Sequence, residues 1–183
     1  MPDAQVTRLP VSFAQQRMWF LEQLAPGEPT YNMPYAFWLE GPLDADALQR
    51  AVDAMVVRHA VLRTSIVAFD GVPEQVVART GTVPIERIEL PPTDAGLDSG
   101  GERNRKIESI ADELARQPFD LANAPLIRMA LIVAGPERHL FVLVTHQSIS
   151  DGSSLKILLD EGETGTVWLA RDVGLVRSVN VMP

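Results

Sequence analysis

The fold of this chain is decided by the stretch Val142-Leu143-Val144-Thr145-His146-Gln147-Ser148-Ile149-Ser150-Asp151-Gly152. The apolar and β-branched run from Leu140 to Thr145 is typical of a buried strand. Polar residues then follow, and apolar residues return at helical spacing from Leu155. We therefore predict a strand, a tight polar loop, and a helix that starts near Ser150 or Asp151.

The polar loop has two interpretations. Loops between a strand and a helix often carry functional side chains, because the strand fixes their direction and the loop exposes them. This loop contains an imidazole, an amide, hydroxyl groups and a carboxylate. The alternative is a capped helix start with a hydrogen-bonded structural histidine, and the spacing alone favours this alternative.

The composition limits the classes of protein and site that the chain can form. With 183 residues, 46% hydrophobic and 22% charged, it can form one domain with a core or a large fragment of a longer protein. The net charge of −8 argues against binding to nucleic acid or to an anionic membrane. The lack of cysteine excludes disulfides, thiolate zinc sites and cysteine nucleophiles, and we expect no metal site. Neither a signal peptide nor a spanning run of ~18 apolar residues is present, so we expect a cytoplasmic protein.

The first half of the sequence alternates helical and strand patterns. Residues 1–10 carry no strong pattern and are expected to be loose. Ser12 and Gln15 form a capping box, which marks a helix start. From there we predict a helix to Leu24, and its broad apolar face includes Phe20 and Leu24. The elements predicted after it are a strand over Tyr31–Glu40, a helix from Asp44 or Asp46 to about Arg58, a strand over Thr64–Phe69, a hairpin turn at Asp70-Gly71, a return strand over Glu74–Arg79 and a short strand over Val83–Leu90.

The second half continues with a predicted helix from about Glu102 to Arg116. Leu126–Val133 and Arg138–Thr145 are strongly strand-like and are expected to pair as an antiparallel hairpin, with His139 exposed. Residues 162–183 form a divergent tail that is only weakly strand-like. The whole pattern predicts one α/β (α+β) domain over residues 1–161, with a mixed or antiparallel sheet and helices packed on it.

Four stretches together resemble the condensation domains of nonribosomal peptide synthetases, which belong to the chloramphenicol acetyltransferase-like superfamily. Ser12–Leu21 resembles the first motif of this family and Arg58–Thr64 the second. His146–Gly152 resembles the third, the His-His-x-x-x-Asp-Gly signature, and Pro118–Arg128 resembles the segment before it. The resemblance covers residues 8–161. It implies a chloramphenicol acetyltransferase-like two-layer sandwich and only the N-terminal half of a domain whose two halves form a V.

The resemblance also implies roles for the loop. In the family the second histidine of the signature takes a proton from the acceptor amine or orients it, and here this position is Gln147. A glutamine amide forms hydrogen bonds but cannot act as a base. His146 matches the first, structural histidine. Asp151 matches an aspartate that holds the loop through an ion pair with an arginine, and Gly152 permits close approach of a phosphopantetheine arm.

Six residues of the first two motifs are expected to support the structure. We interpret Arg17 as structural, and His59 and Arg63 as buried polar contacts that support the loop. The supporting residues are Ser12, Gln15, Arg17, Arg58, His59 and Arg63.

The resemblance implies amide formation between a carrier-bound acyl or peptidyl donor and an aminoacyl acceptor. No cofactor is expected to bind directly, although the carrier proteins would bring phosphopantetheine. Because Gln147 replaces the histidine and the second half is absent, we expect little activity from this chain alone. The alternatives are a non-catalytic scaffold that binds a carrier protein, a complementary half or a second copy, and a related acyltransferase that uses a coenzyme A thioester.

Overall fold

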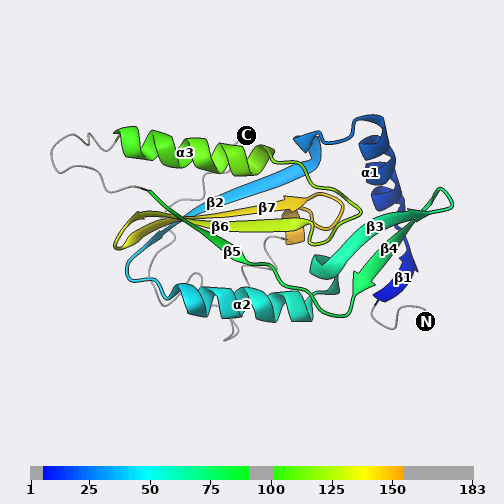
Figure 1. Cartoon of the computed structure of the whole chain (residues 1–183), viewed down its shortest axis with the longest axis horizontal. Helices are drawn as coiled ribbons and strands as arrows, with labels where there is room; N and C mark the ends of the chain where they lie inside the picture. The colour runs from blue at the N-terminus through cyan, green and yellow to red at the C-terminus, as the bar shows by residue number, and fades with distance from the viewer. Residues whose placement is uncertain (1–5, 91–100, 155–183) are drawn as a thin grey trace.

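The computed structural model describes residues 6–90 and 101–154 (Figure 1). The elements are, in chain order, β1 (Val6–Pro10), α1 (Phe13–Leu24), the 3-10 helix η1 (Pro29–Tyr31), β2 (Asn32–Glu40), α2 (Ala45–Arg58), the 3-10 helix η2 (Ala60–Arg63), β3 (Thr64–Phe69), β4 (Val72–Ala78), β5 (Ile85–Glu89), α3 (Gly101–Arg116), β6 (Ile127–Gly135) and β7 (Arg138–His146). The strands and helices predicted between Ser12 and His146 are confirmed to within a few residues. The α/β class with a mixed sheet is confirmed as well.

The larger sheet has four strands in the order β2-β7-β6-β5. β6 and β7 form the predicted antiparallel hairpin, β2 pairs antiparallel with β7, and β5 runs parallel to β6. In β7 every side chain from His139 to His146 is buried. Successive side chains of a strand point to opposite faces, so both faces of this sheet are covered.

The helices α2 and α3 cover the two faces of this sheet, and Figure 1 draws them on opposite sides of it. On the face of α3, the Asn32 amide donates to the carbonyls of Ala115 (2.7 Å) and Gln117 (2.8 Å) at the end of the helix. On the other face, α2 buries the stripe predicted from its three-and-four spacing. The Gln49 side chain of α2 accepts a hydrogen bond from Ile85 N (2.8 Å) and donates one to Val83 O (3.1 Å).

The smaller sheet has three antiparallel strands in the order β1-β4-β3. Its hairpin turns at Asp70 (φ 51°) and Gly71 (φ 80°), as the Asp-Gly signal predicts. Two positive φ angles are those of a type I′ turn, whose twist matches that of paired strands. Ile66 N of β3 donates to Leu121 O (2.7 Å), which joins this sheet to the segment leading into β6.

Three sequence-based expectations about this part of the chain are wrong. Residues 6–10 are not loose, because they pair with β4 as β1. His139 is buried, not exposed, because it faces inward beside Leu39 in the centre of the sheet. Phe20 and Leu24 of α1 are 55% and 66% exposed, and α1 has no buried residue.

The expectations for the C-terminal part fall largely outside the described residues. The helix predicted near Ser150 or Asp151 begins at Gly152 and is described as far as Ser154. The tail predicted over residues 162–183 lies outside them. No helix of residues 6–90 and 101–154 is long and apolar enough to cross a membrane.

We predict that Gly71→Ala lowers the free energy of unfolding by about 1 kcal/mol, because an L-residue is strained at this positive φ. A Cβ at this position would meet no atom within 4 Å, so the cost is one of backbone conformation alone. The matched control is Gly135→Ala, where a Cβ also has open space and no positive φ occurs. Urea denaturation of both variants tests this, and an equal loss of stability in the two would contradict it.

Candidate functional site

The loop from His146 to Gly152 leaves the sheet at the end of β7 and is fixed there by backbone hydrogen bonds. His146 N donates to Leu126 O (3.0 Å), and Gln147 N donates to Tyr31 O (2.9 Å). Ile149 N then turns back to His146 O (3.0 Å). Two segments far apart in the sequence therefore determine where the loop begins.

His146 is a buried, neutral side chain, which fits the structural role that the resemblance implies. Its Nδ1 accepts a hydrogen bond from Ser148 N (3.1 Å) and lies 2.8 Å from the Ser148 hydroxyl. The rings of Tyr31 and Phe119 meet the imidazole edge to face, each with centroids 6.2 Å away. Burial lowers the pKa of His146 to about 4. Because Nδ1 accepts, the single proton of the neutral ring is on Nε2.

Arg128 packs on the ring of Phe119, which in turn contacts His146. Its guanidinium carbon lies 4.1 Å from the centre of the Phe119 ring. The same group donates to the carbonyls of Leu114, Gln117 and Pro118 at the end of α3. The segment that leads into β6 is thus joined to the end of α3 beside the Phe119 ring, which contacts His146.

Gln147 has the opposite environment, because its side chain is exposed. The backbone N–H of Gln147 donates to Tyr31 O, whereas its side-chain amide is exposed and can be reached by a ligand from solvent. An amide at this point can donate and accept hydrogen bonds but cannot take a proton near neutral pH.

Asp151 caps the start of the next helix. Its Oδ1 accepts from Ser154 N (2.9 Å) and from the Ser154 hydroxyl (2.8 Å), and these bonds lower its pKa. Within residues 6–90 and 101–154 no arginine forms an ion pair with Asp151, and the expected pair stays a prediction. The carboxylate acts as a helix cap, which fits the structural interpretation of the loop.

The close approach of a phosphopantetheine arm expected at Gly152 stays a prediction, and the described residues leave space for it. Gly152 is exposed, and no atom lies within 4 Å of the position that a Cβ would take.

Tyr35 was missed by the reasoning from sequence because it lies in the middle of β2, yet it faces the loop. Burial raises the pKa of Tyr35, and the negative charge of Asp151 raises it further. The Thr145 hydroxyl, on the same face, contacts the Ser150 hydroxyl. Tyr35 and Thr145 share a face because Tyr35 pairs with Leu143, two residues before Thr145, and this β2–β7 register has no local signal in the sequence.

The first motif lies against the loop. The predicted capping box is present: the Ser12 hydroxyl accepts from Gln15 N (3.2 Å), and the Gln15 Oε1 accepts from Ser12 N (2.9 Å). The Gln15 Nε2 also donates to Ser148 O (3.2 Å), inside the loop. Arg17 is exposed on α1, and the structure gives it no supporting contact with the described residues.

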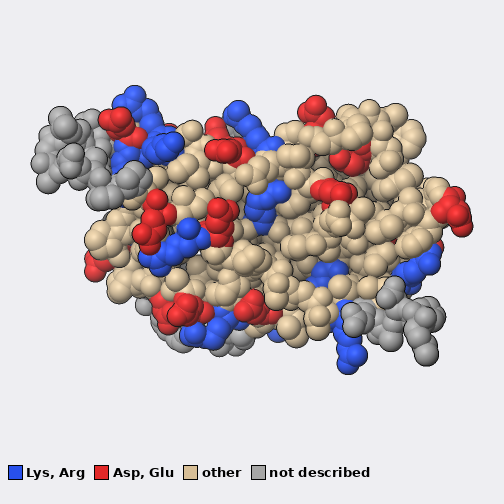
Figure 2. Space-filling model, viewed as in Figure 1, with Lys and Arg blue, Asp and Glu red and all other residues tan. Residues whose placement is uncertain are grey.

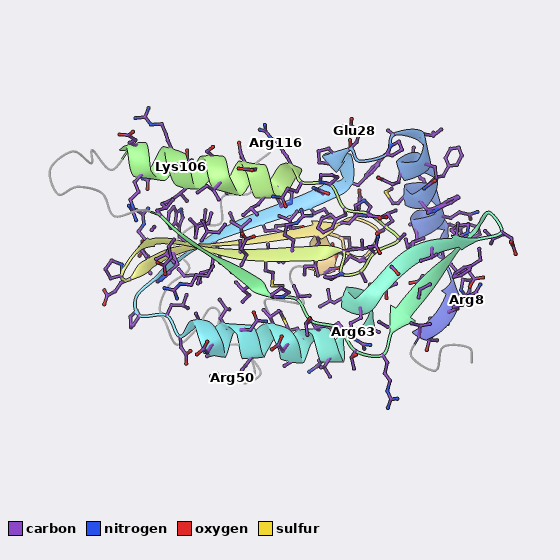
Figure 3. All side chains as sticks on the ribbon, in the orientation of Figure 1. Arg8, Glu28, Arg50, Arg63, Lys106 and Arg116 are labelled. Carbon is purple, nitrogen blue, oxygen red and sulfur yellow. The ribbon has the colours of Figure 1, made fainter. Side chains whose placement is uncertain are left out.

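The second motif lies at the junction of α2 and the smaller sheet. The Arg63 guanidinium donates to the carbonyls of Val56 and Val57 at the end of α2, and to those of Ala78 and Arg79 at the end of β4. Figure 3 shows Arg63 at this junction. Arg63 is thus a structural contact as predicted, but it supports this junction and not the loop.

His59 is half-buried and ends α2, with its N–H donating to Met55 O (2.8 Å), whereas Arg58, the last residue of α2, is exposed. Both residues belong to the turn between the helix and β3.

The remaining charges on the drawn face are of mixed sign. Acidic and basic side chains are interspersed over the face drawn in Figure 2. Within residues 6–90 and 101–154, no group of three or more His, Asp or Glu side chains could hold a metal ion.

We predict that protonation of His146 destabilises the fold in acid. The folded pKa of about 4 lies below the ordinary value of about 6.5, so the neutral ring contributes stability that is complete above pH 6.5 and is lost as the pH falls toward 4. The loss from this residue is at most about 1.4 kcal/mol per pH unit. Urea denaturation between pH 7 and 4.5 should show a steeper loss for the wild type than for His146→Asn, which keeps an acceptor but does not titrate in this range. Equal slopes, or a pKa near 6.5 in an NMR titration, would show that the ring is not desolvated.

Comparisons with known proteins assign the chain to a family. The sequence model of the Condensation domain matches residues 5–163. Chondramide synthase cmdD from Chondromyces crocatus is 39% identical over 163 residues, which are 89% of this chain and 4% of that protein. Tyrocidine synthase 3 from Brevibacillus parabrevis is 41% identical over 152 residues, which are 83% of this chain and 2% of the relative.

Solved structures show the same fold. The starter condensation domain of rhizomide synthetase RzmA matches with a TM-score of 0.73 at 22% identity, covering 84% of this chain and 37% of that one. The first condensation domain of the CDA synthetase matches with a TM-score of 0.68 at 24% identity, covering 83% and 37%. The chain thus spans little more than a third of the solved domains that it matches. On the family match and these relatives, the chain belongs to the condensation-domain family of nonribosomal peptide synthetases, of which it represents a partial domain.

Proposed function

We propose that this chain supplies the N-terminal half of a condensation site, in which an amide bond forms between a carrier-bound acyl or peptidyl donor and a carrier-bound aminoacyl acceptor. The observation that carries the proposal is the exposed Gln147 amide, held by its backbone at the end of β7 where the family motif has its second histidine.

In this reaction the acceptor amine attacks the thioester carbonyl, a C–N bond forms, the C–S bond breaks, and the amine nitrogen loses a proton as the thiol leaves. The Gln147 carbonyl oxygen can accept a hydrogen bond from the amine and orient it. An amide is not a base and the neighbouring His146, with a pKa of about 4, is a very weak one, so the proton passes through solvent to the sulfur of the leaving thiol. The chain on its own would therefore be inactive or nearly so.

The partners follow from the reaction. A variant of the RzmA starter domain was crystallised in complex with C8-CoA and Leu-SNAC. By analogy, the donor and acceptor here would arrive as thioesters on the phosphopantetheine arms of carrier proteins. The second half of the site would come from a complementary condensation half.

A non-catalytic binding module is the second candidate. Phe13, Phe20 and Leu24 lie seven and four positions apart on α1 and are 92%, 55% and 66% exposed. Such a row on one side of a helix favours a partner surface. A carrier protein, a complementary half or a second copy would cover it.

The first prediction from this proposal concerns activity. The chain is mixed with the C-terminal half of the matching condensation domain of tyrocidine synthase 3, and with an acylated donor and an aminoacylated acceptor carrier protein. We expect no amide above background from the chain alone and a slow rate from the pair. Gln147→His should raise the rate of the pair by roughly 10²-fold, because it restores a group that accepts a proton near neutral pH.

The matched control is Gln147→Asn, which keeps an amide on a shorter side chain and should give no increase in the rate of the pair. Amide formation by the chain alone would contradict its expected inactivity. A pair that binds but stays inactive with Gln147→His would instead favour the binding module, and mass spectrometry of the carrier-bound product decides between these outcomes.

A further inference from the structure

We infer that Gln15 is a positioning residue that fixes the Gln147 loop to α1 and to the smaller sheet, beyond its part in the helix cap. Its effect on turnover rests on the proposed function, whereas its effect on the loop does not.

The side-chain amide of Gln15 forms hydrogen bonds with three partners. The Gln15 Oε1 accepts from Ser12 N (2.9 Å), while Nε2 donates to both Ser148 O (3.2 Å) and Gln75 Oε1 (3.1 Å). The side chain is half-buried, and its oxygen and its NH₂ group are both engaged. A residue needed only for the cap would use only the oxygen.

The orientation of this amide is set by its partners. Ser12 N can only donate, and Ser148 O can only accept. Turning the amide over would place Nε2 against Ser12 N, so that two donors would meet. It would also place Oε1 against the oxygens of Ser148 and Gln75, so that acceptors would meet. The Nε2 atom therefore faces the loop.

The bond from Gln15 to Ser148 holds the loop around Gln147. Ser148 N donates to His146 Nδ1 (3.1 Å), and Gln147 N donates to Tyr31 O (2.9 Å). Because Gln15 also donates to Ser148 O, hydrogen bonds hold the loop on both sides of Gln147. The exposed Gln147 amide therefore projects from a backbone held by α1, by η1 and by the buried imidazole.

The side chain of Gln75 connects Gln15, and through it the loop, to the smaller sheet. Gln75 of β4, which accepts from Gln15, donates through its own Nε2 to Pro10 O (2.9 Å) at the end of β1. β1 leads directly into Ser12 and α1, which lie beside β1 and β4 at one end of the molecule in Figure 1. A pair of amides thus joins a sheet edge, a helix start and the loop of the site.

The test uses Gln15→Glu in the full chain. A carboxylate can still accept from Ser12 N and complete the capping box, but it cannot donate to Ser148 O. We expect hydrogen exchange at the Gln147 and Ser148 amides to become about tenfold faster, and the carbonyl carbon of Ser148 to shift in the NMR spectrum. The amide of Leu140, in the middle of the sheet, should exchange at its wild-type rate.

The matched control is Ser12→Ala, which removes the cap acceptor and leaves the bond from Gln15 to the loop. It should lower the melting temperature without changing exchange at Gln147. A second variant, Gln15→Met, is uncharged and of similar size, and it must loosen the loop as well. Wild-type exchange at Gln147 and Ser148 in both Gln15 variants would overturn the proposal and leave Gln15 as a cap alone.

The consequence for turnover is measured in the complemented pair that carries Gln147→His. Adding Gln15→Glu should lower kcat about tenfold while the KM for the acceptor changes little, because the catalytic group is misplaced and not the binding surface. An unchanged kcat would refute this role in turnover. If the pair forms no amide at all, the proposed function fails, and the exchange experiment still decides what Gln15 does to the loop.

Discussion

The pairing and burial of β7 is the constraint on which the rest of the structure depends. β2 and β6 hydrogen-bond to its two edges, and α2 and α3 cover its two faces. The loop of the site continues this strand without a break, so the register of β7 determines which residue leaves the sheet facing the core. A slip of one residue would exchange the environments of His146 and Gln147.

Those two adjacent environments explain why proton chemistry could occur at only one of them. At His146, burial lowers the pKa to about 4, and Nδ1 is already an acceptor for Ser148. An imidazole at the exposed position 147 would lose little hydration and would keep a pKa nearer its ordinary value of about 6.5. The geometry of the strand end therefore decides where a base can function, and the surviving histidine is not in that place.

Local patterns predicted most elements but not the long-range contacts. The stripe of α2, the hairpin of β6 and β7, and the turn at Asp70-Gly71 each depend on neighbouring residues, so periodicity and turn chemistry suffice. β1 has no such pattern, because every residue in it is exposed and its strand character comes from pairing with β4. The capping box of Ser12 was predictable, whereas the bond from Gln15 to Ser148, 133 positions away, has no local signal.

The same contrast explains how α1 is held. A helix of 12 residues is marginal on its own, and this one has no buried residue to supply a large hydrophobic contribution. Trp19 packs half-buried against the core, and polar contacts add to this, namely the cap at Ser12 and the bonds from Gln15 to Gln75 and Ser148. Since one of those bonds ends within the loop, the positions of α1 and of the loop are coupled.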